Sequence, residues 1–334
     1  MKRKKLNLLL AVLLISAIAM LFVSCGKDTY VPNGEIYDTL PPYDEYEGRD
    51  TCSHRIKEVF VRTDTSETIK ACTLCGYNSD GYHYYHTYDM IDGSVLGKYE
   101  KILIKLNADY NDKTLNIRSD VSELILIGNE GQTLDGLQIN VEARRSELTI
   151  SLSDVNVISN KTVIDAGNCD KDITIKTYGT SNSLTTRNGK AGEDGELVTV
   201  TKNYTYQYYA NSGTDGENAA DVIRTGASIS LCAYSPLDVK AGDGGKGGNG
   251  ASHKSGSIGF GIANGGGNGG HGGKGGSAVV YSGNLLIIEG EDKITLTSGI
   301  GGKGGSGGKK YSGSGSLVYN YSDGTDGYNG ADGN

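Results

Sequence analysis

The stretch Leu237–Ile294 begins L-D-V-K-A-G-D-G-G-K-G-G-N-G and, after a short tip, returns as G-G-G-N-G-G-H-G-G-K-G-G-S-A-V-V-Y. Glycine occupies every third position of both arms, at Gly242, Gly245 and Gly248 and again at Gly267, Gly270, Gly273 and Gly276. Three residues is the turn length of the polyproline II helix, which makes no internal hydrogen bonds. Glycine at each third position leaves one edge without side chains, so backbones can approach closely. The pattern predicts extended arms that lie side by side and hydrogen-bond to each other.

The same unit occurs three times, as glycine-rich excursions over residues 189–219, 242–276 and 299–333. The first two return arms align without a gap, which places Gly216 over Gly273 and Val222 over Val279. Self-similarity at a fixed period is typical of stacked repeats. Collagen is excluded because none of the 4 Pro lies in a glycine arm. A disordered linker would not keep this spacing in three copies.

Short apolar strands also repeat outside the glycine arms. One series starts at Ile102, Leu124, Leu148, Ile173, Ile229 and Leu286, and a second follows it at Leu115, Ile139, Val163, Val222 and Val279. The early members are about 22–25 residues apart, which is within the range of solenoid repeats. The two series predict an all-β fold, a right-handed parallel β-helix over residues 97–334. An antiparallel β-sandwich, which also has many short strands, is the alternative.

Composition narrows the choice of partners. The chain has 334 residues, a net charge of −8 and 37% hydrophobic residues, with 51 Gly and no Trp. A negative chain is a poor ligand for nucleic acid. A solenoid suits the modest apolar content, because each coil buries only a few side chains against its neighbours.

The N-terminus has the anatomy of an export signal. Basic residues open Met1–Ser24, an apolar run follows, and the end reads Leu21-Phe22-Val23-Ser24-Cys25-Gly26. This end resembles the lipobox of bacterial lipoproteins, in which cleavage precedes a cysteine that carries the lipids; Phe22 departs from the usual Leu. The resemblance implies lipid attachment at Cys25 and a surface-facing anchor in the bacterial cell membrane. An ordinary signal peptide with an incidental cysteine is the alternative. Residues 25–50 are expected to form a disordered tether.

A metal knuckle is expected in residues 51–96. Cys52-Ser53-His54 is followed by Cys72-Thr73-Leu74-Cys75-Gly76, which offers four N and S ligands of the kind zinc takes tetrahedrally. Lys57–Arg62 and Glu67–Ala71 are expected to form a joining hairpin. The layout resembles small zinc-ribbon-like modules of bacterial surface proteins, which implies a structural zinc. A disulfide among Cys52, Cys72 and Cys75 is the alternative, and His83 or His86 could replace His54.

The tips of the excursions alternate bulky side chains at every second position, which places each set on one face of a strand. The aromatic members are Tyr204, Tyr206, Tyr208, Phe260, Tyr319 and Tyr321. Stacked tips would form a small sheet whose apolar face is either the packed core of this lobe or a platform for a glycan or a partner protein.

The expected function is that of a lipid-anchored cell-surface protein with a binding or structural role, such as an adhesin or a glycan-binding module. A β-helix polysaccharide lyase or hydrolase is the alternative by fold analogy. The strand series shows no in-register Asp/Asp, Asp/Lys or Asp/Arg set, so no catalytic residues are expected. Cys169 and Cys232 are expected to be buried, and Arg144-Arg145 to form a solvated turn. The open C-terminal coil could pair with a second chain.

Overall fold

The computed structural model describes residues 56–72, 81–85, 87–91, 95–97, 99–144, 146–202, 205–253, 261–263, 265–284, 286–290, 293–310, 312 and 322–334. The chain divides into two units, Met1–His86 and Thr87–Asn334. Each unit is described separately below. Among the described residues, helix is limited to the short 3-10 turns Tyr88–Met90 and Ala108–Tyr110 and to the single residue Lys293.

The first unit contains an antiparallel hairpin of β1 (Ile56–Arg62) and β2 (Glu67–Cys72), followed by β3 (His83–Tyr85). A register shift between Glu58 and Phe60 bends β1, and Phe60, Ile69 and Ala71 are buried. The hairpin expected between the two cysteine arms is therefore present. At the turn of the hairpin, Arg62 forms an ion pair with Glu67 (3.2 Å) and donates a hydrogen bond to Tyr82 Oη (2.6 Å).

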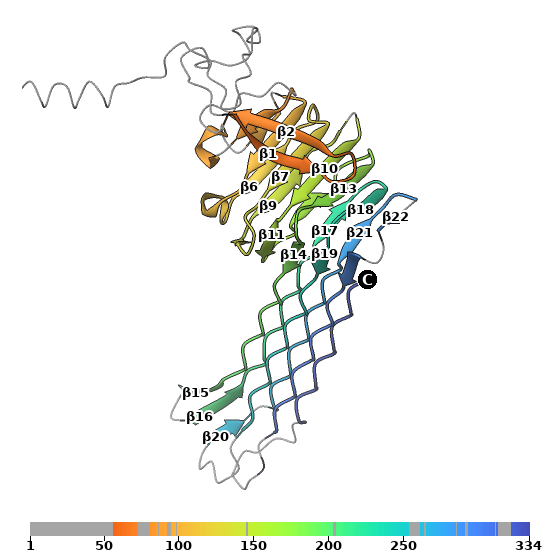
Figure 1. Cartoon of the computed structure of the whole chain (residues 1–334). Coiled ribbons are helices and arrows are strands. Elements are labelled where there is room, and N and C mark those ends of the chain that lie inside the picture. Colours follow the sequence, from red (N-terminus) through yellow and green to blue (C-terminus); the bar gives the residue numbers. More distant parts are fainter. Residues whose placement is uncertain are drawn as a thin grey trace, which may run out of the picture. The chain divides into compact units, whose positions relative to one another are not determined.

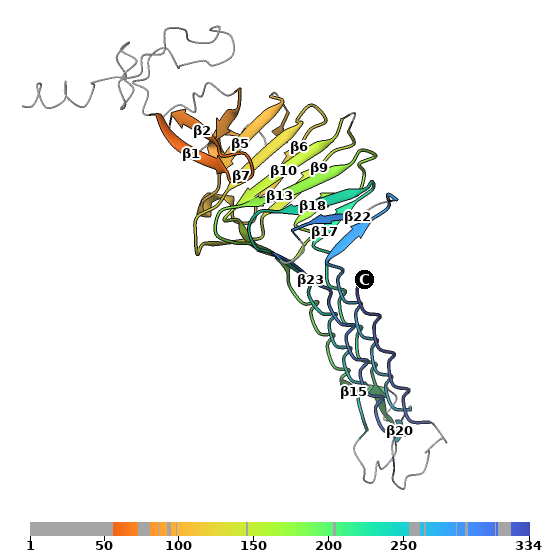
Figure 2. The same ribbon diagram turned by 45° about the vertical axis from the view of Figure 1, so that its right-hand side comes forward.

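The second unit is built from coils whose strands form three parallel sheets (Figures 1 and 2). The first sheet contains β5 (Lys101–Lys105), β7 (Glu123–Ile127), β10 (Leu148–Ser153), β13 (Ile173–Tyr178), β18 (Ile229–Ala233) and β22 (Leu286–Glu289). The second contains β4 (Val95–Leu96), β6 (Thr114–Ile117), β9 (Gln138–Val141), β12 (Ile164–Ala166), β17 (Ile223–Thr225) and β21 (Val279–Tyr281). The third contains β8 (Thr133–Asp135), β11 (Asn156–Ser159), β14 (Asn182–Thr186), β19 (Leu237–Lys240) and β23 (Ile294–Thr297).

The core is the column of apolar side chains that these sheets enclose. Alternate residues of each strand point inward, and equivalent positions stack from coil to coil, as in the ladder Ile173, Ile229 and Leu286. Ile102, Leu124, Ile150, Ile175 and Leu231 are all fully buried. Parallel pairing confirms the expected stacked coils and excludes the antiparallel sandwich.

Three register expectations are wrong in detail. Ile139 lies opposite Ile164 rather than the expected Val163. Leu124 lies opposite Ile150 rather than Leu148, so the first series steps by two residues there. Val279 lies opposite Ile223, one residue away from the expected Val222. The sequence Val222-Ile223 offers two adjacent apolar side chains, both buried, so hydrophobicity alone does not distinguish the registers.

The excursions leave the coils between the third sheet and the next strand of the second sheet. They follow β14, β19 and β23 and, in the first two cases, return into β17 and β21. Figures 1 and 2 show them extending side by side away from the coils. We call them outgoing arms 1 to 3 (residues 188–196, 241–253 and 298–310) and return arms 1 to 3 (211–221, 265–277 and 322–334).

Candidate functional site

The arms form a two-layered bundle that carries the tip of the excursions. The outgoing arms bond to each other in order, as in Gly192 N–H to Lys246 O (2.7 Å) and Gly247 N–H to Lys303 O (2.8 Å). The return arms form the second layer, as in Gly213 N–H to Asn268 O (2.9 Å). Bonds such as Gly245 N–H to Glu217 O (2.8 Å) join the layers. The bonds recur at every third residue, as expected for polyproline II arms.

The residues of each arm repeat in threes. The first residue of a triplet points away from the bundle and is called outward, and the second points toward the other layer and is called facing. The third points toward the preceding arm of its own layer and is called lateral. In outgoing arm 2 these are Lys246, Gly247 and Gly248. A Cβ on Gly247 would lie 2.1 Å from Gly270 O in the other layer, and one on Gly248 would lie 1.9 Å from Glu193 O in its own layer. Both positions therefore require glycine.

The same rule explains where glycine is dispensable. Arm pair 1 has no preceding arm, and its lateral positions carry side chains such as Lys190, Glu193 and Glu217. Return arm 3 has no later outgoing arm to face, and its facing positions are Asp326, Asn329 and Asp332. Their Oδ1 atoms accept hydrogen bonds from the Gly307, Gly304 and Gly301 N–H groups at 2.7, 3.0 and 2.7 Å, and so close this edge of outgoing arm 3.

Outward side chains supply a further set of bonds. Asp215 Oδ1 accepts from His271 N–H (2.6 Å), and His271 Nδ1 accepts from Tyr328 N–H (3.0 Å), in a row across the return layer. Parallel rows run through Asn218 to Lys274 and through Asn249 to Ser306. Short Asp, Asn and Ser residues at these positions therefore complete the hydrogen bonding of backbones that have no internal bonds. Sequence analysis missed this role.

The same hydrogen bonds show that the expected alignment of the first two return arms is wrong by one residue. Because Asp215 pairs with His271, Gly216 is equivalent to Gly272 and not to Gly273. The interior arms carry glycine at both the facing and the lateral position, so threefold spacing fits two registers equally well.

The bundle ends in a three-stranded tip sheet. It contains β15 (Leu197–Lys202), β16 (Thr205–Ala210) and β20 (Gly261–Ala263). The first two strands pair antiparallel, and β20 lies parallel to β16. The order β15-β16-β20 leaves β15 as one edge. The sheet thus combines segments of the first and second excursions, as expected for stacked tips.

Two tyrosines share one face of the tip sheet. Tyr206 and Tyr208 lie opposite Thr201 and Thr199, and their ring centroids are 6.5 Å apart with planes tilted by 33°. Tyr206 is 52% exposed and Tyr208 is half-buried. The other face of the hairpin is also open, since Tyr209, Val198 and Val200 are all exposed there. Among the described residues, the tip therefore presents an aromatic surface to solvent.

The other expected tip residues are only partly placed. Tyr204, Phe260, Tyr319 and Tyr321 lie outside the described residues. The register aligns Ile262 with Gln207, not with Tyr206 or Tyr208. Ile262 therefore does not fall in step with the tyrosines of the first tip.

Of the four expected zinc ligands, the structure describes Cys72 alone, buried at the end of β2 opposite Ile56. Cys52, His54 and Cys75 lie outside the described residues, as do His86 and the expected lipid site Cys25. His83 contacts the Tyr85 ring edge-on at 4.5 Å, in line with a packing role. Within the described part of the chain, no cluster of His, Cys, Asp or Glu could hold a metal, and no helix has the length and apolar character to span a membrane.

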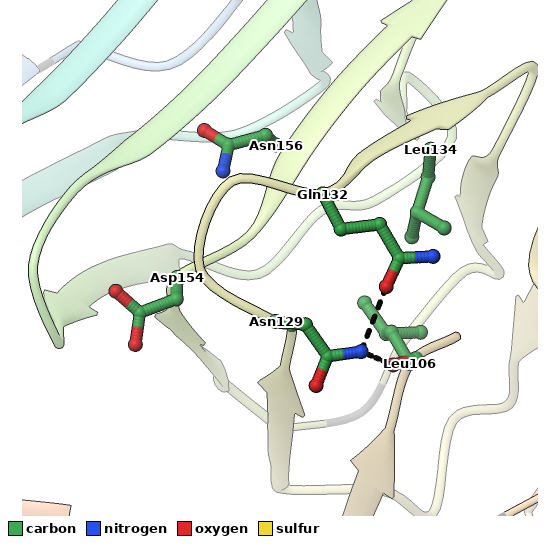
Figure 3. A pocket seen from close by; sticks show the side chains of 7 residues that line it. Leu106, Asn129, Gln132, Leu134, Asp154 and Asn156 are labelled. Atoms are coloured by element: carbon green, nitrogen blue, oxygen red, sulfur yellow. Dashed lines mark hydrogen bonds between the residues drawn. The ribbon is translucent and has the colours of Figure 1, made fainter. Parts of the chain in front are cut away.

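The coils carry a small hollow at a turn between Asn129, Gln132, Asp154 and Asn156 (Figure 3). The hollow has essentially no enclosed space for a ligand, whereas ordinary ligand pockets enclose ~300 Å³ or more. Asn129 Nδ2 donates to Gln132 Oε1 (2.7 Å), and Asp154 accepts the Thr180 N–H (2.6 Å). Burial lowers the pKa of nearby Lys105, whose Nζ donates to Gly128 O (2.6 Å). Asn129, Asp154 and Lys105 thus already have hydrogen-bond partners within the protein, and they stabilise the turn.

Two acid–base pairs lie on the outside of the coils, and one of them corrects an expectation. Asp165 and Arg224 lie directly opposite each other in β12 and β17, 3.1 Å apart, so an in-register Asp/Arg set does exist. Arg187 binds Asp135 through two hydrogen bonds of 2.9 and 2.7 Å, which lowers the pKa of that carboxyl. A carboxylate held ionised by arginine is a poor general acid.

Cys169 and Cys232 are buried, as expected. Burial raises the pKa of Cys169 to about 11, and its thiol lies 3.2 Å from Glu142 O. Arg144 is not in a solvated turn: it is 3% exposed, and its guanidinium donates to Ser146 O and Arg118 O. Bonding to carbonyls between coils offsets the cost of its burial. Arg145 lies outside the described residues.

Comparisons of the chain with models of protein families, with curated proteins and with solved structures found no match. The tip sheet is therefore the candidate site on its own geometry: two neighbouring tyrosines, flanking threonine hydroxyls and a backbone held by the arms.

Proposed function

We propose that this chain is a lipid-anchored surface protein that binds glycans through the tyrosine face of its tip sheet. The observation that carries the proposal is the pair of an exposed Tyr206 and a half-buried Tyr208 on a strand at the end of the arm bundle. Tyrosine offers an apolar ring and a polar hydroxyl together. Such rings stack against the C–H faces of sugars, while Thr199 and Thr201, both exposed, can bond sugar hydroxyls.

The arms give the tip a defined position. Hydrogen bonds at every third residue connect each arm to its neighbours, and interior glycines keep the backbones in contact. A site supported by such a bundle loses less conformational freedom on binding than a free loop does. Coils that close as a right-handed β-helix, the hand of nearly all parallel crossovers, would form the base of this display.

The test is binding of the full chain to a glycan array and to acidic and neutral polysaccharides. Tyr206→Ala should weaken retention at least tenfold, because it removes the more exposed ring. Tyr328→Ala is the matched control, since Tyr328 is also exposed but lies on a return arm, stacked on His271 at 5.3 Å. Equal loss in both variants, or no glycan bound by the wild type, would overturn the proposal. Release of shortened polysaccharide fragments would favour the alternative function, that of a polysaccharide lyase or hydrolase.

The N-terminal unit is proposed to hold one structural zinc through Cys52, His54, Cys72 and Cys75. Burial of Cys72 at the end of a short hairpin supports this, because so small a module needs a metal or disulfides to fold. The purified chain should contain about one zinc per molecule, and Cys72→Ser should lose it. A metal-free chain with two of these cysteines joined would establish the disulfide instead.

Anchoring is proposed through lipids on Cys25. Several acyl chains at one cysteine hold a protein on a bilayer stably, whereas one chain does not. Cys25→Ser should abolish incorporation of labelled fatty acid and release the chain from the membrane fraction. Labelled fatty acid retained in that variant would contradict the assignment.

A further inference from the structure

Strand β15 forms an edge of the tip sheet that carries none of the usual protection. In the order β15-β16-β20 it has a neighbouring strand on one side only, among the strands that the structure describes. From Leu197 to Thr201 it reads L-V-T-V-T, without a proline or a charge, and no register shift interrupts its pairing with β16. Val198 is 38% and Val200 is 43% exposed. Because proteins normally protect edge strands by such features, a bare edge indicates a surface that pairs with another chain.

The backbone of β15 presents hydrogen-bonding groups at this edge. At the start of the strand, Asn211 N–H donates to Glu196 O (3.0 Å), so the carbonyl of Glu196 points toward β16. Along an antiparallel strand, the backbone groups of successive residues point alternately to the two sides. The N–H and C=O groups of Leu197, Thr199 and Thr201 therefore point to the free edge. Pairing at this edge leaves the hydrogen bonds between β15 and β16 intact.

We propose that β15 pairs antiparallel with β15 of a second copy of this chain, around a two-fold axis at Thr199. In this register Thr199 lies opposite Thr199 of the second copy, and Leu197 lies opposite Thr201 of the second copy. Each N–H group that points to the free edge then meets a carbonyl of the other chain, as antiparallel pairing requires. A two-fold contact uses the same patch of both chains, so the pairing ends with the dimer and does not continue into a fibre.

The sequence of β15 is complementary to itself when the axis lies at Thr199. This register sets Val198 opposite Val200, a β-branched pair, and Glu196 opposite Lys202, which are residues of unlike charge. Cross-strand pairs of both kinds stabilise a sheet. An axis at Val198 would instead set Glu196 opposite Val200, and an axis at Val200 would set Lys202 opposite Val198. This self-complementarity favours a second copy over an unrelated peptide as the occupant of the edge.

The proposed pairing joins the two tip sheets into one and points the two chains in opposite directions. Outgoing arm 1 and return arm 1 join the hairpin of β15 and β16 at the same end. In an antiparallel pair these ends lie on opposite sides of the joined sheet, so the two chains meet tip to tip. The two-fold axis is perpendicular to the sheet, and Tyr206 and Tyr208 of both copies therefore lie on one face. Such a contact suits chains anchored in two facing membranes, a consequence that alone rests on the proposed lipid anchor.

A disulfide formed across the axis tests the register in the purified full chain. Under mild oxidation, Thr199→Cys should yield a product of twice the chain mass that is linked through position 199 of both copies, as peptide mass spectrometry would show. Opposed Cα atoms of a hydrogen-bonded antiparallel pair are about 5.5 Å apart, which a disulfide can span. Thr201→Cys is the matched control, because this position is also exposed but would lie about 14 Å from its counterpart, four residues along the strand. No link at position 199, or equal linking at both positions, would overturn the proposal.

A second measurement is the dissociation constant of the dimer, from light scattering over a dilution series. Thr199→Pro removes an N–H group at the free edge, where a sheet tolerates proline, and should raise the constant about 30-fold because each dimer loses two hydrogen bonds. Thr199→Ala keeps this N–H group and is the matched control, with an expected change below about fivefold. A wild-type monomer, or a proline variant that dimerises as tightly as the alanine variant, would contradict the inference. Tyr206→Ala, which should weaken glycan retention, should remain a dimer, so the two proposals can fail independently.

Discussion

Replacing the lateral glycine Gly270 with alanine tests the glycine rule where it is most demanding. The new Cβ would lie 1.9 Å from Thr214 O, whereas ordinary contacts begin near 3.4 Å. Return arms 1 and 2 must therefore separate by about 1.5 Å, the difference between the two distances. Two bonds of Gly270 lie beside this contact: its N–H to Gly248 O and its carbonyl to Gly305 N–H, both 2.8 Å.

The expected cost follows from these contacts. Two weakened hydrogen bonds contribute about 2 kcal/mol, and overpacking adds ~1–3 kcal/mol. The lower entropy of unfolded alanine offsets about 0.5–1 kcal/mol of this. The arms should lose about 3 kcal/mol of local stability, which is a roughly 100-fold rise in amide exchange, since each 1.4 kcal/mol is tenfold.

Hydrogen exchange read by mass spectrometry on peptides from residues 241–253 and 265–277 measures this loss. Glu217→Ala is the matched control, because Glu217 holds a lateral position in return arm 1, which has no preceding arm. It should change exchange of the same peptides less than threefold, the scale of an ordinary surface substitution. If Gly270→Ala exchanges like the control, the close packing of arms is refuted.

Three further predictions concern other parts of the molecule. Asp326→Ala removes the acceptor of the Gly307 N–H bond (2.7 Å) and should speed exchange of that amide about fivefold, the equivalent of ~1 kcal/mol; Lys303→Ala, an outward residue of the same outgoing arm, should not. Cys169, with its buried thiol and a pKa raised to about 11, should resist alkylation at pH 8 in the folded chain and react once unfolded, as mass spectrometry would show; rapid labelling of the folded chain would contradict the burial. Arg187 lowers the pKa of Asp135, so the stability from this pair is present above the ordinary aspartate pKa and is lost as the pH falls through the lowered one. Asp135→Asn should therefore lower the melting temperature at pH 7 but not near pH 2, and an equal change at both pH values would count against the pair.

The coils could be predicted from sequence because their chemistry is repetitive. Most inward positions are Val, Ile or Leu, and the spacing of Ile173, Ile229 and Leu286 places them in one ladder. Register was harder where two adjacent apolar residues compete, as at Val222-Ile223, since both are buried. In the interior arms, two of the three residues of each triplet are glycine, so the return arms can likewise be aligned in two ways.

The arrangement of the arms in two layers could not be derived from the threefold spacing. That spacing predicts that backbones come close, but it does not indicate which arms are neighbours. The positions where glycine is missing hold this information, because Glu193 and Asp326 mark arms without a neighbour on one side. The acceptor role of Asp215 was equally hidden, since it depends on His271, which lies 56 residues later.

At the candidate site, period-two alternation correctly placed Tyr206 and Tyr208 on one face of a strand. It could not align the second tip with the first, because register between separate excursions is set by the arms that lead to them. Burial of Arg144 also escaped prediction, since a charged pair in a turn normally faces water. The guanidinium is accommodated by carbonyls that only the stacked coils bring together.

The most direct test of the arm bundle is detection of scalar couplings across its hydrogen bonds by NMR of glycine-labelled protein. Couplings are expected from Gly273 N to the carbonyl carbon of Gly245 and from Gly302 N to that of Gly273, whose N–O distances are 2.7 and 2.8 Å. Glycine signals at random-coil positions without such couplings would show that the arms do not pack together.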